Sequence, residues 1–233
     1  VYASEDRLAM AWAANQPEST RAQTMLAGRL YRHGQITLAL TTVESALARH
    51  PDNAGLAENL VYLKCMRGDL ADTDMQALTT LLRDAPFDRG GFSNIETLRL
   101  LANTHQCTPL NAQSWQLLVH ALLANPNYFD GVASGFLHYQ LHEAAVTEGD
   151  LGEAIRQLDA AYAKDPNAEI VRLQAKYLAS AGLYDQAIAT LQHANYSRLP
   201  LLRRLLVNDR AINEQAINIL KQQQEVAPQP KSP

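Results

Sequence analysis

The feature that most constrains this chain is a spacing of glycine, alanine and proline that occurs more than once. Gly34 and Ala39 are five residues apart, Ala46 follows seven residues later, and Pro51 comes five residues after that. Repetition at a period of 20 to 50 residues is typical of stacked supersecondary units. Two further sets have this spacing, with the last proline one residue late: Gly149, Ala154, Ala161 and Pro166, then Gly182, Ala187, Ala194 and Pro200.

Each position in the spacing has a physical reason. Glycine such as Gly34 ends one helix and makes a tight turn at low conformational cost. The two alanines, seven residues apart, lie on one helix face and let a neighbouring helix approach closely. The proline stops the second helix and opens the next unit. Leu26, Leu30 and Tyr31 precede Gly34 at helical spacing. The spacing therefore predicts repeated helix–turn–helix units.

These residues resemble the tetratricopeptide repeat (TPR), a helix–turn–helix unit of about 34 residues. The quality of the match varies along the chain, and one unit has Thr73 and Thr80 where alanine is expected. The resemblance implies an all-α fold, a right-handed α-solenoid of TPR-like helix hairpins with irregular helix pairs in the middle and at the ends. The best matches are LAGRLYRHGQITLALTTVESALARHPDN and LHEAAVTEGDLGEAIRQLDAAYAKDPNA.

The expected organisation is one TPR-like superhelical domain over residues 1–222, followed by a Pro-rich, disordered tail over residues 223–233. Terminal units of such an array need a finished outer face, which predicts a capping helix at each end. The expected parts are an N-terminal cap helix at 1–16, two repeats at 20–86, an irregular helix pair at 87–130, two repeats at 131–200, and C-terminal cap helices at 201–222.

The two cysteines, Cys65 and Cys107, allow two interpretations. They form one disulfide, which implies an oxidising compartment, or they are two buried free thiols. Cys65 falls late in the first helix of the second repeat, and Cys107 follows the first helix of the irregular pair. Adjacent elements of a solenoid bring such positions together, and this favours the disulfide.

Several function classes find no support in the sequence. The formal net charge is −4, and no long basic stripe indicates nucleic-acid binding. No run of about 18 apolar residues occurs, so no membrane span is expected within this chain. The chain begins at Val1 rather than Met. We interpret this start as the loss of a targeting segment or as a piece cut from a longer protein.

Catalytic and metal-binding patterns are equally weak. His138 and His142 share a helix face, but Tyr139 stands where a zinc protease motif has its Glu. Ser134 is misplaced for a nucleophile elbow, and no strand precedes it. The sequence therefore predicts no catalytic residue, no metal site, no cofactor and no enzyme.

The TPR resemblance instead implies a binding surface, because the first helix of each unit lines the concave face in this repeat type. Aromatic side chains there serve as anchors for a partner, and cations there meet carboxylates. Carried over position by position, the predicted partner-binding residues are Arg21, Tyr31, Phe136, Tyr139, Glu143, Arg172 and Lys176.

Two functions fit this surface. The first is a non-catalytic module that binds a protein, as a peptide or a partner domain, in the concave groove. The alternative is a periplasmic accessory domain of a membrane glycosyltransferase that binds glycan or lipid. The order of repeats around the Cys-containing middle is also similar to soluble C-terminal domains of bacterial multi-span membrane proteins of the O-glycosyltransferase and polymer-ligase type. That resemblance implies a periplasmic location, tethered to the inner membrane by a missing N-terminal region, with a cytoplasmic location as the alternative. The sequence does not predict the oligomeric state.

Overall fold

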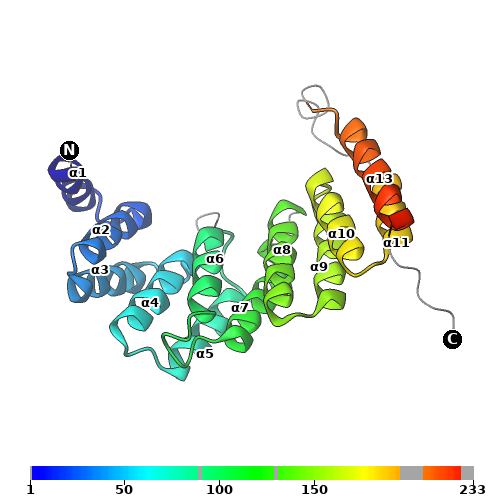
Figure 1. Ribbon diagram of the computed structural model, residues 1–233. Coiled ribbons are helices and arrows are strands. Elements are labelled where there is room, and N and C mark those ends of the chain that lie inside the picture. The colour runs from blue at the N-terminus through cyan, green and yellow to red at the C-terminus, as the bar shows by residue number, and fades with distance from the viewer. Residues whose placement is uncertain (1, 89–90, 129–130, 195–206, 227–233) are drawn as a thin grey trace. The chain divides into compact units, whose positions relative to one another are not determined.

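The computed structural model describes residues 2–88, 91–128, 131–194 and 207–226, and all regular structure within these residues is helical. Contacts group the helices into two compact units, unit 1 (Val1–Phe129) and unit 2 (Asp130–Pro233), and each is described by itself. The expected single domain over residues 1–222 therefore stays a prediction. Within each unit, consecutive helices pack as hairpins, the arrangement of an α-solenoid (Figure 1).

Unit 1 consists of a leading helix, two hairpins and an irregular pair. The leading helix α1 packs on α2, and α2 packs on α3. Between the hairpins, α3 contacts α4, so that one apolar cluster joins α2, α3 and α4. The elements are α1 (Tyr2–Asn15), α2 (Thr20–Arg32), α3 (Ile36–Arg49), α4 (Ala54–Arg67), α5 (Asp72–Leu82), α6 (Gly91–Ala102), α7 (Ala112–Ala124) and the short 3-10 helix η1 (Pro126–Tyr128).

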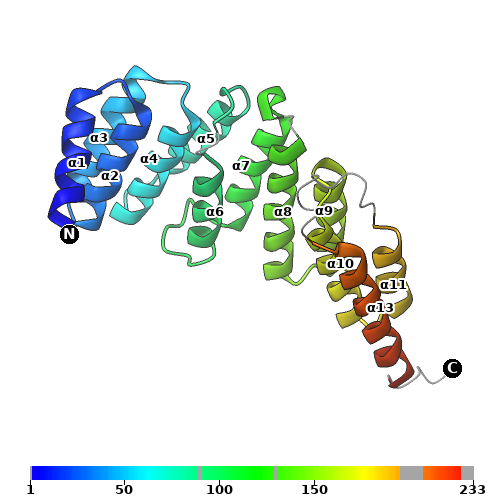
Figure 2. The same ribbon diagram turned by 90° about the horizontal axis from the view of Figure 1, so that it is seen from above.

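Unit 2 holds two further hairpins and a C-terminal helix, which follow one another in Figure 2. They are α8 (Gly131–Glu148) with α9 (Leu151–Lys164), α10 (Ala168–Ser180) with α11 (Tyr184–Gln192), and α13 (Asp209–Val226). Helix α13 continues four residues into the segment expected to be a disordered tail. Its last turns are held because Leu220 is buried against α11 and Gln224 donates a hydrogen bond to Asp185 at 2.9 Å. Residues 201–206 of the expected C-terminal cap helices, and residues 227–233 of the expected tail, lie outside the described part.

The glycine positions act as the spacing predicts, and so do the alanine positions except Ala194, which is half-buried and lies after the end of α11. Glycine ends the first helix of each hairpin with a positive φ, which other residues adopt only under strain. The φ angles are 74° at Gly34, 87° at Gly68, 78° at Gly149 and 77° at Gly182. The alanines that let the hairpin close are fully buried: Ala39, Ala46, Ala154, Ala161 and Ala187.

The second repeat departs from the expected pattern. Thr73 and Thr80, which occupy the alanine positions of the repeat, are exposed on α5. The interior positions are taken by Met75 and Leu82, which are also seven residues apart and are 5% and 0% exposed. Helix α5 therefore buries Met75 and Leu82 in place of the two threonines, whose hydroxyl groups are costly to bury without a hydrogen-bond partner.

Long-range contacts that the repeat pattern does not contain hold the irregular pair α6–α7. Trp115 of α7 is buried and donates its indole N–H to the Ile95 carbonyl of α6 at 2.9 Å. Buried Asn125 donates to the carbonyl oxygens of Leu82 and Ala85 at 2.7 and 2.9 Å, and so caps the end of α5.

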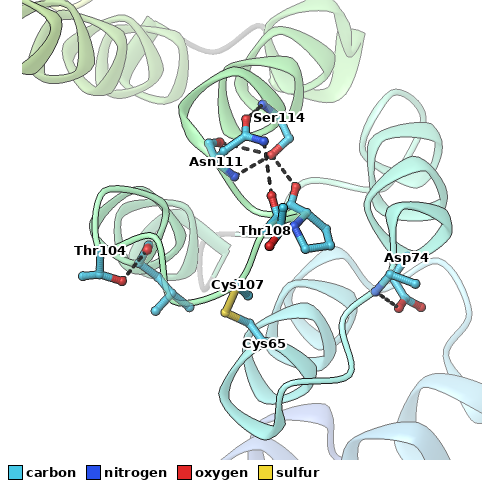
Figure 3. Close-up of a disulfide and its surroundings, with 10 residues drawn as sticks. Cys65, Asp74, Thr104, Cys107, Thr108, Asn111 and Ser114 are labelled. Carbon is cyan, nitrogen blue, oxygen red and sulfur yellow. Dashed lines mark hydrogen bonds between the residues drawn. A yellow bond between two sulfur atoms is a disulfide. The ribbon is translucent and has the colours of Figure 1, made fainter.

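A disulfide joins Cys65, near the end of α4, to Cys107 in the segment after α6 (Figure 3). The Cα atoms of the two cysteines are 5.5 Å apart. Beside the bridge, Asn111 and Ser114 exchange hydrogen bonds between side chain and backbone, in both directions, and cap α7. The disulfide thus fixes the connection between α6 and α7 to the second hairpin.

A carboxyl group lies buried between α4 and α6. Glu58 is 1% exposed, and no described group forms a hydrogen bond with its Oε2. Burial raises the pKa of Glu58 well above its ordinary value of 4.5, the nearby charge of Asp88 adds to this, and a hydrogen bond from Asn94 opposes it. Asn94 lies inside α6 and also donates to the Gly55 carbonyl at 3.2 Å.

This buried carboxyl predicts a pH dependence of stability. Because the folded-state pKa is raised, the folded protein retains a proton that the unfolded chain releases. The free energy of unfolding of unit 1 should then fall as pH rises from about 4.5 towards the folded pKa of Glu58, by about 1.4 kcal/mol per tenfold difference in proton affinity. Glu58→Gln removes the ionisation and should flatten this fall, as measured by urea unfolding between about pH 4.5 and 8.

The matched control is Glu96→Gln, at an exposed position of α6, which should follow the native curve. Equal slopes for Glu58→Gln and the native chain would disprove the assignment.

Candidate binding site

Four of the residues predicted to bind a partner surround one hollow in unit 2, which we call the α8–α10 hollow. Phe136 and Tyr139 come from α8, and Arg172 and Lys176 come from α10. The hollow has a volume of about 650 Å³. Its remaining lining mixes apolar and acidic side chains: Val132, Gly135, Asp165, Asn167, Glu169, Ile170 and Leu173. The first helices of two consecutive hairpins thus form the two sides of one site.

The Tyr139 ring lies against a buried histidine of its own helix. His142, one turn further along α8, is 0% exposed, and its ring centre lies 4.9 Å from that of Tyr139. Its Nδ1 is 3.0 Å from the Tyr139 carbonyl oxygen, which can only accept, so Nδ1 carries the proton. The Tyr177 hydroxyl of α10 then donates to Nε2 at 3.2 Å. Burial, with the charge of Glu143 second, raises the pKa of Tyr177. This network links α8 to α10, and the Tyr139 ring packs against its buried histidine.

Arg172 has a structural role that the sequence did not reveal. Its Nη1 donates to Asp209 of α13 at 3.0 Å and to Asn213 at 3.3 Å, and Nη2 lies 3.5 Å from Glu169. Because these carboxylates already compensate the guanidinium charge, Arg172 is less available to an incoming carboxylate than predicted. Its first effect is to tie α13 to α10.

Lys176 and Glu143 differ in how they are placed. Lys176 is exposed at the edge of the hollow and forms no ion pair with the residues that the structure describes. Glu143 is half-buried beside His142, with Oε1 3.8 Å from Nδ1, and does not line the hollow. Of the predicted charged residues in unit 2, Lys176 is therefore the one that presents an available charge.

Arg21 and Tyr31 belong to unit 1, on α2. Arg21 is exposed. The Tyr31 ring meets that of Tyr62 edge-on at 5.6 Å, and burial together with this neighbour raises the pKa of Tyr62 to about 12. A binding role for these two residues stays a prediction.

The histidines considered as metal ligands have other contacts. His138 Nδ1 lies 2.8 Å from Gln157 Oε1, and His142 is buried as described. Within the described ranges, no three His, Cys, Asp or Glu side chains gather in a metal-binding arrangement. Among the helices of those ranges, none combines the length and the apolar character needed to cross a bilayer.

The sequence did not reveal a second groove in unit 2, between α10 and α13. Its lining includes Ala216 and Ile219, on a helix that has no repeat signature. The apolar residues of α13 recur at helical spacing, so the helix itself can be predicted. The face that α13 turns towards α10 depends on the contacts of Arg172 with Asp209 and Asn213. Only the folded chain therefore defines this groove.

Comparison with known proteins returns structural neighbours only. No protein-family model matches the chain, and no curated protein does. Among solved structures, the Thermus thermophilus TPR protein TTC0263 is 21% identical with a TM-score of 0.41 and covers 86% of this chain and 100% of its own. The TPR domain of P58(IPK) is 14% identical with a TM-score of 0.40, over 95% of this chain and 60% of that one.

Proposed function

We propose that this chain is a protein-interaction module and that the α8–α10 hollow binds a peptide or a partner domain. The observation that carries the proposal is that Phe136, Tyr139 and Lys176, from two hairpins, surround one hollow of about 650 Å³. Aromatic side chains that are held in place lose little conformational entropy on binding and commonly dominate interface energetics. Tyr139 meets this condition because buried His142 supports it.

The partner is expected to combine an apolar group with a carboxylate. Apolar lining from Val132, Ile170 and Leu173 accepts the first, and Lys176 meets the second at the edge of the hollow. An accessory domain that binds glycan or lipid is the alternative function, since Phe136 and Tyr139 are also suitable platforms for sugar rings. Binding of a soluble oligosaccharide, with no protein partner, would favour that alternative.

We also propose that the domain works in an oxidising compartment, as part of a bacterial envelope protein in the periplasm. The disulfide between Cys65 and Cys107 supports this location, because such bridges persist where glutathione does not reduce them. When cells that make the protein are lysed in an alkylating agent without reductant, mass spectrometry is expected to find no alkylated cysteine. Two reactive thiols would contradict the location.

The binding function is tested by affinity capture with the native chain and two variants. Tyr139→Ala and Lys176→Glu should each weaken a captured partner by about tenfold or more, the effect of losing a central anchor or reversing a charge contact. Affinity is then measured by calorimetry with the isolated partner. The matched control for the charge reversal is Lys221→Glu, at an exposed position of α13 that lines neither the α8–α10 hollow nor the second groove. Unchanged affinity in both Tyr139→Ala and Lys176→Glu would remove the α8–α10 hollow from the function.

A further inference from the structure

Unit 2 contains a larger groove than the one just described, which we call the α10–α13 groove. Its volume is about 1030 Å³. One wall is α10, the other is α13, and Tyr184 and Leu191 of α11 lie at its base. The walls are formed by Arg172, Ala175, Lys176, Ala179 and Ser180 on α10, and by Ala216, Ile219, Leu220, Gln222, Gln223 and Val226 on α13.

The groove has one closed end. Arg172 joins α10 to the first turns of α13 through Asp209 and Asn213. Towards its C-terminus, α13 is held by α11 instead, through Gln224 and Asp185. Among the described residues, polar contacts join the two walls at the Arg172 end, and Leu220 of α13 shares an apolar cluster with Ala175 and Leu178 of α10. Small side chains on both walls, among them Ala179 and Ala216, keep the space between them free.

The lining of the α10–α13 groove is apolar with a cationic edge. Ile219 is 47% exposed and Val226 is 85% exposed, so apolar surface remains in contact with water. The lining includes two basic residues and no acidic one among the described residues. Asp209 and Glu169 compensate Arg172, whereas Lys176 has no ion pair within the described part of the chain. The groove therefore favours an apolar occupant with a negative charge beside Lys176.

The walls also restrict the form of the occupant. Both are helices whose backbone groups bond within the helix, so no strand edge is available for an added strand. Affinity must then come from side chains. The lining residues recur at three- and four-residue steps, over stretches of about 12 Å on α10 (residues 172–180) and about 15 Å on α13 (residues 216–226). Two to three turns of an amphipathic helix present a stripe of side chains over that length.

We propose that the α10–α13 groove binds an amphipathic helix of a partner protein, with apolar side chains packed between α10 and α13 and an acidic side chain paired with Lys176. This goes beyond the α8–α10 hollow, because it uses a different surface that shares only Arg172 and Lys176 with it.

The test uses a displayed library of random peptides of about 16 residues, long enough for four helical turns. The peptides are selected on the native chain, and the enriched peptides are synthesised with a fluorophore for anisotropy. We expect apolar residues at i, i+3 or i+4 and i+7 with a flanking Asp or Glu. Ile219→Lys and Lys176→Glu should each raise Kd by about tenfold or more. Changing the peptide acid to Lys should restore binding to Lys176→Glu.

Two variants make the result specific. Ile212→Lys is the matched control for Ile219→Lys, because Ile212 lies on the same helix and is 42% exposed but does not line the groove. Tyr139→Ala changes only the α8–α10 hollow. The proposal predicts unchanged Kd in both. Equal binding to Ile219→Lys and to the native chain, or enrichment of peptides without this pattern, overturns it. A loss in Tyr139→Ala alone would support the α8–α10 hollow while overturning this proposal.

Discussion

Replacing both Cys65 and Cys107 with alanine is expected to lower the free energy of unfolding of unit 1 by about 4 kcal/mol. The disulfide joins residues 42 positions apart, and the chain-entropy model assigns about 4 kcal/mol to the closure of a loop of that length. The loss is large because the bridge encloses α5 and α6 and fixes the segment before α7. Alanine avoids burying a new hydroxyl, since Cys65 and Cys107 are only 4% and 8% exposed.

The two tryptophans make this effect measurable within one unit. Trp12 and Trp115 both belong to unit 1, so their fluorescence reports its unfolding, while far-UV circular dichroism reports both units. In urea, the fluorescence transition of the double variant should move to lower concentration. Dithiothreitol should move the native transition to the same place and leave the variant unchanged. Coincident fluorescence transitions of oxidised native protein and variant would contradict a stabilising role for the bridge.

The hairpins themselves could be predicted from the sequence because their signals are local. Gly34 and Gly149 take the positive φ that their position in the repeat requires, and Ala39 and Ala154 are buried where the repeat spacing places them. Each signal concerns residues a few positions apart, so a single sequence contains all the information. The α8–α10 hollow follows from the same regularity, since Tyr139 and Lys176 lie on the first helices of consecutive repeats.

The remaining features depend on residues far apart in the chain. The contact of Arg172 with Asp209 spans 37 positions, and Asn125 caps α5 from 43 positions away. No periodicity relates these residues, so the sequence indicated neither the compensation of the Arg172 charge nor the α10–α13 groove. In the second repeat Gly68 has a positive φ like the other repeat glycines, but the burial of Met75 instead of Thr73 depends on which face of α5 packs best.

Trp115→Ala is expected to be the most destabilising single substitution considered, with a loss of about 3–5 kcal/mol in unit 1. Trp115 is 1% exposed and is the largest of the fully buried side chains. It takes the place of the repeat signature in the α6–α7 pair, where no Gly–Ala spacing brings the helices together. Removing the indole leaves a cavity on the side of α7 that faces α6, where the indole reaches the Ile95 carbonyl.

Trp115→Phe separates packing from hydrogen bonding. Phenylalanine keeps most of the apolar volume but lacks the pyrrole ring that makes the 2.9 Å hydrogen bond to Ile95, so we expect a loss of about 1 kcal/mol. Urea unfolding followed by circular dichroism and by the fluorescence of Trp12 measures both variants in the same unit. Trp12→Phe, at a half-buried position of α1, should change stability much less than Trp115→Ala. If Trp115→Ala and Trp115→Phe cost the same, the hydrogen bond rather than the packing holds α7 to α6, and the α6–α7 pair is not organised around its tryptophan.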